Sequence, residues 1–150
     1  MLILAFGDSV TKGCMRGRLD PGAVYHNRLK RLLEQQYPEA VFSVINAGVG
    51  GETVADGMRR LERDLIAHQP DLALLGFGLN DTGGGPEGAF AFQSGLAEVV
   101  RRVRTATAAD VALLTPNFMN RGPTDPPPEW RHCIEPFMAR QNGGVVAAYA

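Results

Sequence analysis

Short apolar runs alternate with longer amphipathic stretches along this chain, and no other feature limits its fold as strongly. Five of these runs have the length of β-strands, and the segments between them have helical periodicity. Strands that alternate with helices favour a parallel sheet with helices on both faces. We therefore predict a three-layer α/β/α domain with a doubly wound, flavodoxin-like parallel sheet of about five strands. The predicted strands are Leu2–Phe6, Val41–Ile45, Leu72–Phe77, Val111–Leu114 and Val145–Tyr149.

Apolar residues at helical spacing mark the intervening helices. Asp20 and Pro21 are typical of an N-cap followed by proline at the first helical position, and Tyr37-Pro38 would end that first helix. A proline-rich stretch at 117–128 predicts a loop, and 129–141 a fourth helix. The stripes expected to face the core are Tyr25, Leu29, Leu32 and Leu33; Val54, Met58, Leu61 and Leu65; and Phe92, Leu96, Val99 and Val103.

The length and net charge of the chain limit which kinds of partner and how many domains it can have. The chain has 150 residues, enough for one domain, which we expect to span 1–150. Fifteen basic and sixteen acidic residues leave a net charge of −1, which argues against nucleic acid or an anionic membrane surface as a partner. No apolar run approaches the ~20 residues of a membrane span. Cys14 and Cys133 lack a CxxC spacing and are expected to be free thiols, so we expect a cytoplasmic protein.

Polar and glycine-rich segments follow three successive predicted strands. Gly7-Asp8-Ser9-Val10 follows the first, Asn46–Thr53 the second and Gly78-Leu79-Asn80-Asp81 the third. Taken singly, each has an ordinary interpretation as a turn, a loop or the start of a helix. In a parallel α/β sheet, however, the loops after the strands meet at one edge, where ligands bind. A serine, glycine amides and an asparagine amide at that edge would suit acyl transfer with a stabilised oxyanion.

Together the three segments resemble the blocks of the SGNH/GDSL hydrolase family, in order, from residue 1 to about residue 116. The resemblance implies a serine esterase that acts on a carboxylic ester or thioester of a small molecule through an acyl-serine intermediate, without cofactor or metal. By position, Ser9 would be the nucleophile. The oxyanion donors would be the amide of Ser9, the amide of Gly51 (with Gly50 as the alternative) and the side chain of Asn80. Asp8 and Asp81 would support these loops.

The family's late Asp-x-x-His block, which supplies the base, has no match in this chain. The resemblance therefore implies a domain that is incomplete at its C-terminus, with its final helix missing. Apolar sheet surface would then be exposed, and we expect pairing with a second copy as one outcome. His132 is the candidate substitute base, whereas His68 belongs at the opposite end of the strands. His26 could be an exposed helix residue or line the site.

Two other functions remain open from the residues. One is a catalytically inactive SGNH-fold module that binds an acylated or carbohydrate ligand, which the missing base favours and the retained Ser9, Gly51 and Asn80 oppose. The other is a nucleotide-binding flavodoxin-like domain. The first loop lacks a G-x-G-x-x-G or Walker pattern, which argues against it.

Overall fold

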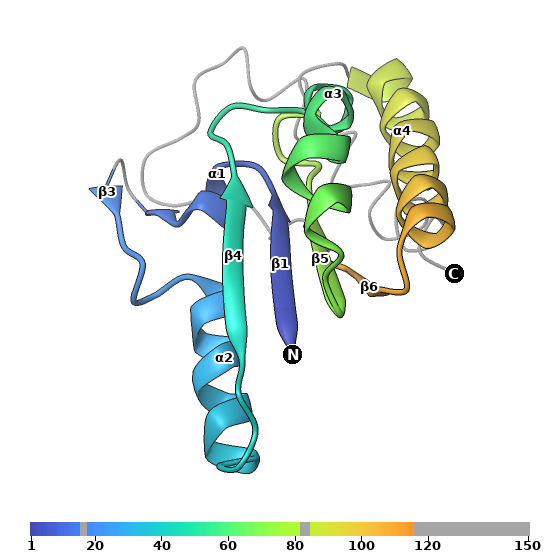
Figure 1. Ribbon diagram of the computed structural model, residues 1–150. Helices are drawn as coiled ribbons and strands as arrows, with labels where there is room; N and C mark the ends of the chain where they lie inside the picture. The colour runs from blue at the N-terminus through green and yellow to red at the C-terminus, as the bar shows by residue number, and fades with distance from the viewer. Residues whose placement is uncertain (16–17, 82–84, 116–150) are drawn as a thin grey trace.

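The computed structural model describes residues 1–15, 18–81 and 85–115. Within them, four parallel strands form a sheet in the order β4-β1-β5-β6 (Figure 1). These are β1 (Leu2–Gly7), β4 (Ser43–Gly48), β5 (Leu72–Gly76) and β6 (Asp110–Leu113). The first strand lies inside the sheet, as a doubly wound fold requires, and the predicted fold class is confirmed. The predicted strand Val145–Tyr149 and helix 129–141 lie outside the described residues.

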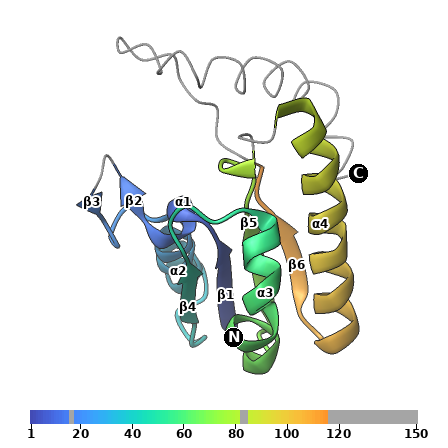
Figure 2. The same ribbon diagram turned by 90° about the horizontal axis from the view of Figure 1, so that it is seen from above.

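Helices cover both faces of this sheet. The long helices are α2 (Tyr25–Gln36), α3 (Val54–Asp64) and α4 (Gly85–Ala106), and the short ones are α1 (Ser9–Lys12) and the 3-10 turn η1 (Ile66–His68). Helices α3 and α4 run next to each other, while α2 lies apart from them and contacts β4 (Figure 2). A small hairpin, β2 (Cys14–Met15) with β3 (Arg18–Leu19), follows α1.

Alternation along β1 divides the core in two. Leu4 and Phe6 point into a cluster with α3 and α4, and Ile3 and Ala5 point into a second cluster with α2. Successive side chains of a strand face opposite sides of a sheet, so a strand with helices on both faces is apolar throughout. All four of these side chains are fully buried.

Three glycines stand in one row where β4, β1 and β5 end. Gly7 pairs with Gly48 on one side and with Gly76 on the other. A Cβ on Gly7 would lie 2.2 Å from the Gly76 carbonyl oxygen, and one on Gly48 would lie 2.2 Å from the Lys12 nitrogen. Real Cβ atoms do not approach backbone this closely, so only glycine lets α1 cross the strand ends at this distance.

Two expectations for the helix after Asp20, which is α2 in the structure, are wrong. Asp20 does not cap it: the Asp20 carboxylate accepts hydrogen bonds from the amides of Gly22 (3.0 Å) and Ala23 (3.1 Å), and so closes a turn. Short acidic side chains favour such local turns, and α2 begins only after Val24, which provides no side-chain cap. Leu32 is 63% exposed and lies off the buried face, although Leu29 and Leu33 pack in the α2 cluster.

The boundaries of two later elements also differ from the sequence prediction. Strand β4 runs two residues past Asn46, so the first part of the predicted glycine-rich loop pairs in the sheet. Val41 precedes the strand and is 79% exposed. Its carbonyl instead accepts a hydrogen bond from the terminal amine of Met1 at 2.9 Å. Helix α4 begins at Gly85, seven residues before Phe92, the first residue of the apolar stripe that predicted it.

Neither a membrane-spanning helix nor a disulfide occurs in the described part of the chain. None of its helices is both long enough and apolar enough to cross a bilayer. Cys14 is a free thiol there, and Cys133 lies outside the described residues.

Two leucines allow a matched test of this packing. We expect Leu61→Ala to lower the free energy of unfolding by about 2–5 kcal/mol, because Leu61 is fully buried between sheet and helices. Leu32→Ala should change it by no more than about 0.5 kcal/mol, since that side chain is mostly in solvent. Urea unfolding of both variants would measure the two changes. Equal losses would contradict the assignment of Leu61 to the core and Leu32 to the surface.

Candidate active site

The three segments singled out in the sequence meet at the carboxyl edge of the sheet. Ser9 follows β1, the loop 49–53 follows β4, and Asn80 follows β5. Backbone hydrogen bonds join them across the glycine row. The Asp8 amide donates to the Gly76 carbonyl (3.2 Å), and the Val49 amide donates to the Gly7 carbonyl (3.0 Å). Backbone hydrogen bonds alone therefore fix the strand ends relative to one another, without any contribution from side chains.

Ser9 is the first residue of α1, and its position is set by Asp8. Asp8 is the N-cap, and its buried carboxylate accepts a hydrogen bond from the Val10 amide at 2.8 Å. The Ser9 amide lies in the same first turn, where helix geometry supplies no backbone acceptor. Among the described residues, the Ser9 hydroxyl also has no hydrogen-bond partner. Asp8 therefore sets the start of α1 and the position of Ser9, and its supporting role in a site stays a prediction.

The loop after β4 lies against Ser9. A Cβ built on Gly50 would be 3.9 Å from the Ser9 Cβ, so these two residues are neighbours. Gly51 is exposed and has φ +81°, a left-handed conformation that side chains other than glycine's rarely adopt. The loop then enters α3 through a capping box. Thr53 accepts from the Asp56 amide (3.3 Å), and Asp56 accepts from the Thr53 amide (3.0 Å). The Thr53 hydroxyl also donates to the Asp56 carboxylate at 2.7 Å, and this bond, followed by the one from the Thr53 amide, lowers the pKa of Asp56.

Asn80 is bound to this loop rather than closing a turn on itself. Its side-chain amide donates to the Glu52 carbonyl at 2.8 Å. An asparagine NH2 has two donors, so one hydrogen bond fixes the group while the second N–H can serve a ligand. Asp81, the next residue, accepts from the Val54 amide at 3.0 Å and so joins the end of β5 to the start of α3. The structure thereby brings Ser9, Gly51 and Asn80 to one edge.

Two carboxyl groups lie behind this edge in low-dielectric surroundings. Burial raises the pKa of Asp8, although the Val10 amide opposes the shift, and the nearby charge of Asp81 raises it further. Burial likewise raises the pKa of Asp81, against the effect of the backbone amides that bond its carboxylate. One Asp81 oxygen is buried without a hydrogen-bond partner among the described residues. Both groups therefore resist ionisation more than an exposed aspartate.

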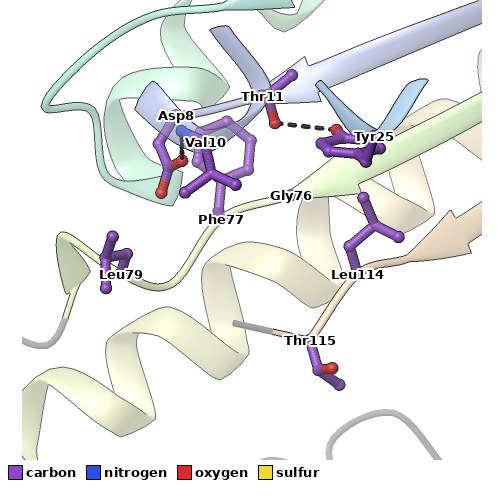
Figure 3. A pocket seen from close by; sticks show the side chains of 9 residues that line it. All are labelled: Asp8, Val10, Thr11, Tyr25, Gly76, Phe77, Leu79, Leu114 and Thr115. Carbon is purple, nitrogen blue, oxygen red and sulfur yellow. Dashed lines mark hydrogen bonds between the residues drawn. The ribbon is translucent and has the colours of Figure 1, made fainter. Parts of the chain in front are cut away.

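A cavity of about 200 Å³ opens beside the N-cap of α1 (Figure 3). On one wall, the hydroxyl groups of Thr11 and Tyr25 are 3.0 Å apart and hydrogen-bonded. Burial raises the pKa of Tyr25 to about 12, so its hydroxyl stays protonated at neutral pH. The sequence pattern does not reveal this pair, because Tyr25 belongs to an apolar stripe that predicts a core position. The cavity is lined by Asp8, Val10, Thr11, Tyr25, Gly76, Phe77, Leu79, Leu114 and Thr115.

The described histidines do not supply an evident base. His26 is 1% exposed, so its interpretation as an exposed helix residue is wrong. Its Nε2 lies 3.0 Å from the Thr11 carbonyl oxygen, and it thereby ties α2 to α1. His68 lies in η1, just before Asp71, whose amide bonds the Leu2 carbonyl at the opposite end of the strands. His132 lies outside the described residues, and its role as a substitute base stays a prediction.

Arg60 is a buried cation beside the site that no sequence pattern predicted. It is 8% exposed and lies in the second turn of α3, where the apolar stripe gives no reason to expect a charge. Its guanidinium reaches the ends of β1 and β4. The one signal in the sequence was its place between Met58 and Leu61, two residues of the apolar stripe. No group of three or more metal-ligating side chains is present in the described residues.

The raised pKa of Asp8 predicts a pH dependence of stability. A raised carboxyl pKa means that the folded chain binds the proton more tightly than the unfolded chain, so ionisation destabilises the fold. Asp8→Asn cannot ionise and keeps an oxygen for the Val10 amide. The free energy of unfolding of the variant minus that of the parent should therefore rise as pH increases above about 4, and level off above the raised pKa. Urea unfolding across pH would measure this difference, and a pH-independent difference would refute the prediction.

Several known proteins resemble this chain in sequence and in fold. The chain is 37% identical over 86 residues to an acetylxylan esterase of Geobacillus stearothermophilus, a match that covers 53% of this chain and 39% of that protein. A crystal structure of Axe2, an acetylxylan esterase from Geobacillus stearothermophilus, superposes with a TM-score of 0.67 at 26% identity, over 94% of this chain and 70% of the other. A lipase/acylhydrolase from Enterococcus faecalis gives a TM-score of 0.66 at 25% identity, over 94% and 71%.

The family assignment rests on the length of the match. The model of the GDSL-like lipase/acylhydrolase family matches residues 5–144 and so includes all three segments at the carboxyl edge of the sheet. The resemblance seen in the sequence is therefore confirmed, and this chain belongs to the GDSL-like lipase/acylhydrolase family.

Proposed function

We propose that this chain is a serine esterase that hydrolyses carboxylic esters through an acyl-serine intermediate. The observation that carries the proposal is the meeting of Ser9, the Gly50-Gly51 loop and Asn80 at one edge of the sheet, fixed by hydrogen bonds between their segments. A nucleophile and several neutral donors in one place are what acyl transfer requires.

The reaction follows from these groups. The Ser9 oxygen attacks the ester carbonyl carbon, and its proton passes to a general base. Negative charge develops on the carbonyl oxygen, where the amides of Ser9 and Gly51 and the side-chain NH2 of Asn80 would stabilise it. Collapse of the tetrahedral intermediate expels the alcohol, which takes the proton held by the base. The base then removes a proton from the water that attacks the acyl-serine, and returns it to the Ser9 oxygen as the acid leaves. Asp8 and Asp81 do not touch the substrate in this scheme, since their carboxylates hold the Val10 and Val54 amides.

For the substrate class we propose acetyl esters of sugars. The matches from Geobacillus stearothermophilus, one by sequence and one by structure, are described as acetylxylan esterases. The curated relative is matched over only 39% of its length, so its substrate supports the proposal without deciding it.

The first test is turnover of p-nitrophenyl acetate by the 150-residue chain. We expect product release to fall to the background rate in Ser9→Ala, because no other residue would form the acyl intermediate. Ser94→Ala, at an exposed position on α4, should leave the rate unchanged. Asn80→Ala should reduce kcat by about 10²–10³, the usual effect of removing one oxyanion donor.

Two results would count against the proposal. If the Ser9→Ala variant hydrolysed the ester as fast as the parent, Ser9 would not be the nucleophile. If parent and Ser9→Ala both bound an acetylated oligosaccharide equally and neither turned it over, the inactive binding module would be the better account. Where turnover depends on Ser9, loss of activity in His132→Ala would identify the base.

A further inference from the structure

The guanidinium of Arg60 is bonded to both of the strand ends that carry the proposed site. One Nη donates to the Gly7 carbonyl at 3.1 Å, and the other donates to the Ala47 carbonyl at 2.8 Å. Gly7 lies two residues before Ser9, and Ala47 lies near the end of β4. The Arg60 side chain also stacks on the Phe6 ring, 4.3 Å from its centre. A single side chain on α3 thus holds the ends of β1 and β4.

A third contact reaches the residue that links Gly51 to Asn80. Arg60 Nε donates to the Glu52 carboxylate at 2.6 Å. Glu52 directly follows Gly51, and its carbonyl oxygen is the acceptor that fixes the Asn80 amide at 2.8 Å. Any displacement of Glu52 would therefore move two of the three proposed oxyanion donors at once.

The charge of Arg60 is balanced within this cluster. Glu52 and Asp64 both pair with it, and the Asp64 contact is 3.2 Å. Hydrogen bonds from Arg63 and then from Arg60 keep the pKa of Asp64 below its ordinary value. A buried cation is tolerated where anions and carbonyl oxygens saturate it, as they do here. Lysine has no planar fork of donors and could not reach the same acceptors together.

From these contacts we propose that Arg60 is a positioning residue for the oxyanion site: it sets the separation of Ser9, Gly51 and Asn80 without contacting substrate. This rests on the proposed esterase function. Small displacements of reacting groups are costly in acyl transfer, because the donors must meet the oxyanion and not merely the ground-state carbonyl. Arg60 would accordingly affect kcat far more than KM.

The test compares Arg60→Lys with Arg59→Lys in the full 150-residue chain. Arg59 is the adjacent residue and its side chain is 79% exposed, so the control makes the same chemical change on the solvent side of α3. With p-nitrophenyl acetate, we expect Arg60→Lys to lower kcat by about 10- to 100-fold with KM within about twofold. Arg59→Lys should match the parent in both. Circular dichroism would verify that each variant is folded.

A second readout does not depend on turnover. In NMR spectra, the side-chain NH2 of Asn80 should exchange with solvent faster, and shift, in Arg60→Lys but not in Arg59→Lys. If Arg60→Lys failed to fold, Glu52→Gln would replace it. We expect kcat to fall and Asn80 NH2 exchange to become faster in that variant too, but by less, since glutamine keeps the acceptor and loses the charge.

The outcomes separate the two proposals. A parent with no Ser9-dependent turnover would remove the esterase function for this chain, and the Asn80 amide would then decide the positioning role alone. A folded Arg60→Lys variant with parental kcat and an unchanged Asn80 amide would overturn the role of Arg60. Equal changes in kcat and KM, without a change at Asn80, would also overturn it.

Discussion

The close approach of α1 to the ends of three parallel strands is the constraint on which the rest of this site depends. Gly48, Gly7 and Gly76 stand in register, and the backbone of α1 lies so close to Gly48 that a Cβ there would come within 2.2 Å of the Lys12 nitrogen. Since Ser9 begins α1, this packing fixes the height of Ser9 above the sheet. The loop after β4 lies against Ser9, and the loop after β5 is bonded to the loop after β4.

Hydrogen bonds between the loops fix the positions of Ser9, Gly51 and Asn80 relative to one another. Asp8, Asp81 and the Thr53–Asp56 capping box hold backbone amides, and Asn80 is fixed by Glu52. Arg60 adds a further link between the ends of β1 and β4, through the carbonyls of Gly7 and Ala47. Because donors that are fixed in advance need not reorganise when charge develops, such rigidity favours stabilisation of an oxyanion.

Much of this could be predicted from the sequence. Apolar runs and helical stripes identified the parallel sheet, and the order of the three motifs located the edge where they meet. Two local signals misled: the Asp20 carboxylate closes a turn instead of capping α2, and Leu32 faces solvent despite its place in an apolar stripe. The burial of His26 and Arg60 could not be predicted, because their acceptors are carbonyls on distant segments. No local pattern encodes such partners.

The most direct test of this account is a crystal structure of the chain after reaction with a small alkyl phosphonofluoridate, whose tetrahedral adduct imitates the acyl-transfer intermediate. The account predicts phosphorus bonded to the Ser9 oxygen. It also predicts the phosphonyl oxygen within about 2.7–3.1 Å of the Ser9 amide, the Gly51 amide and the Asn80 side-chain nitrogen. An adduct on another residue, or a phosphonyl oxygen directed away from Gly51 and Asn80, would contradict it.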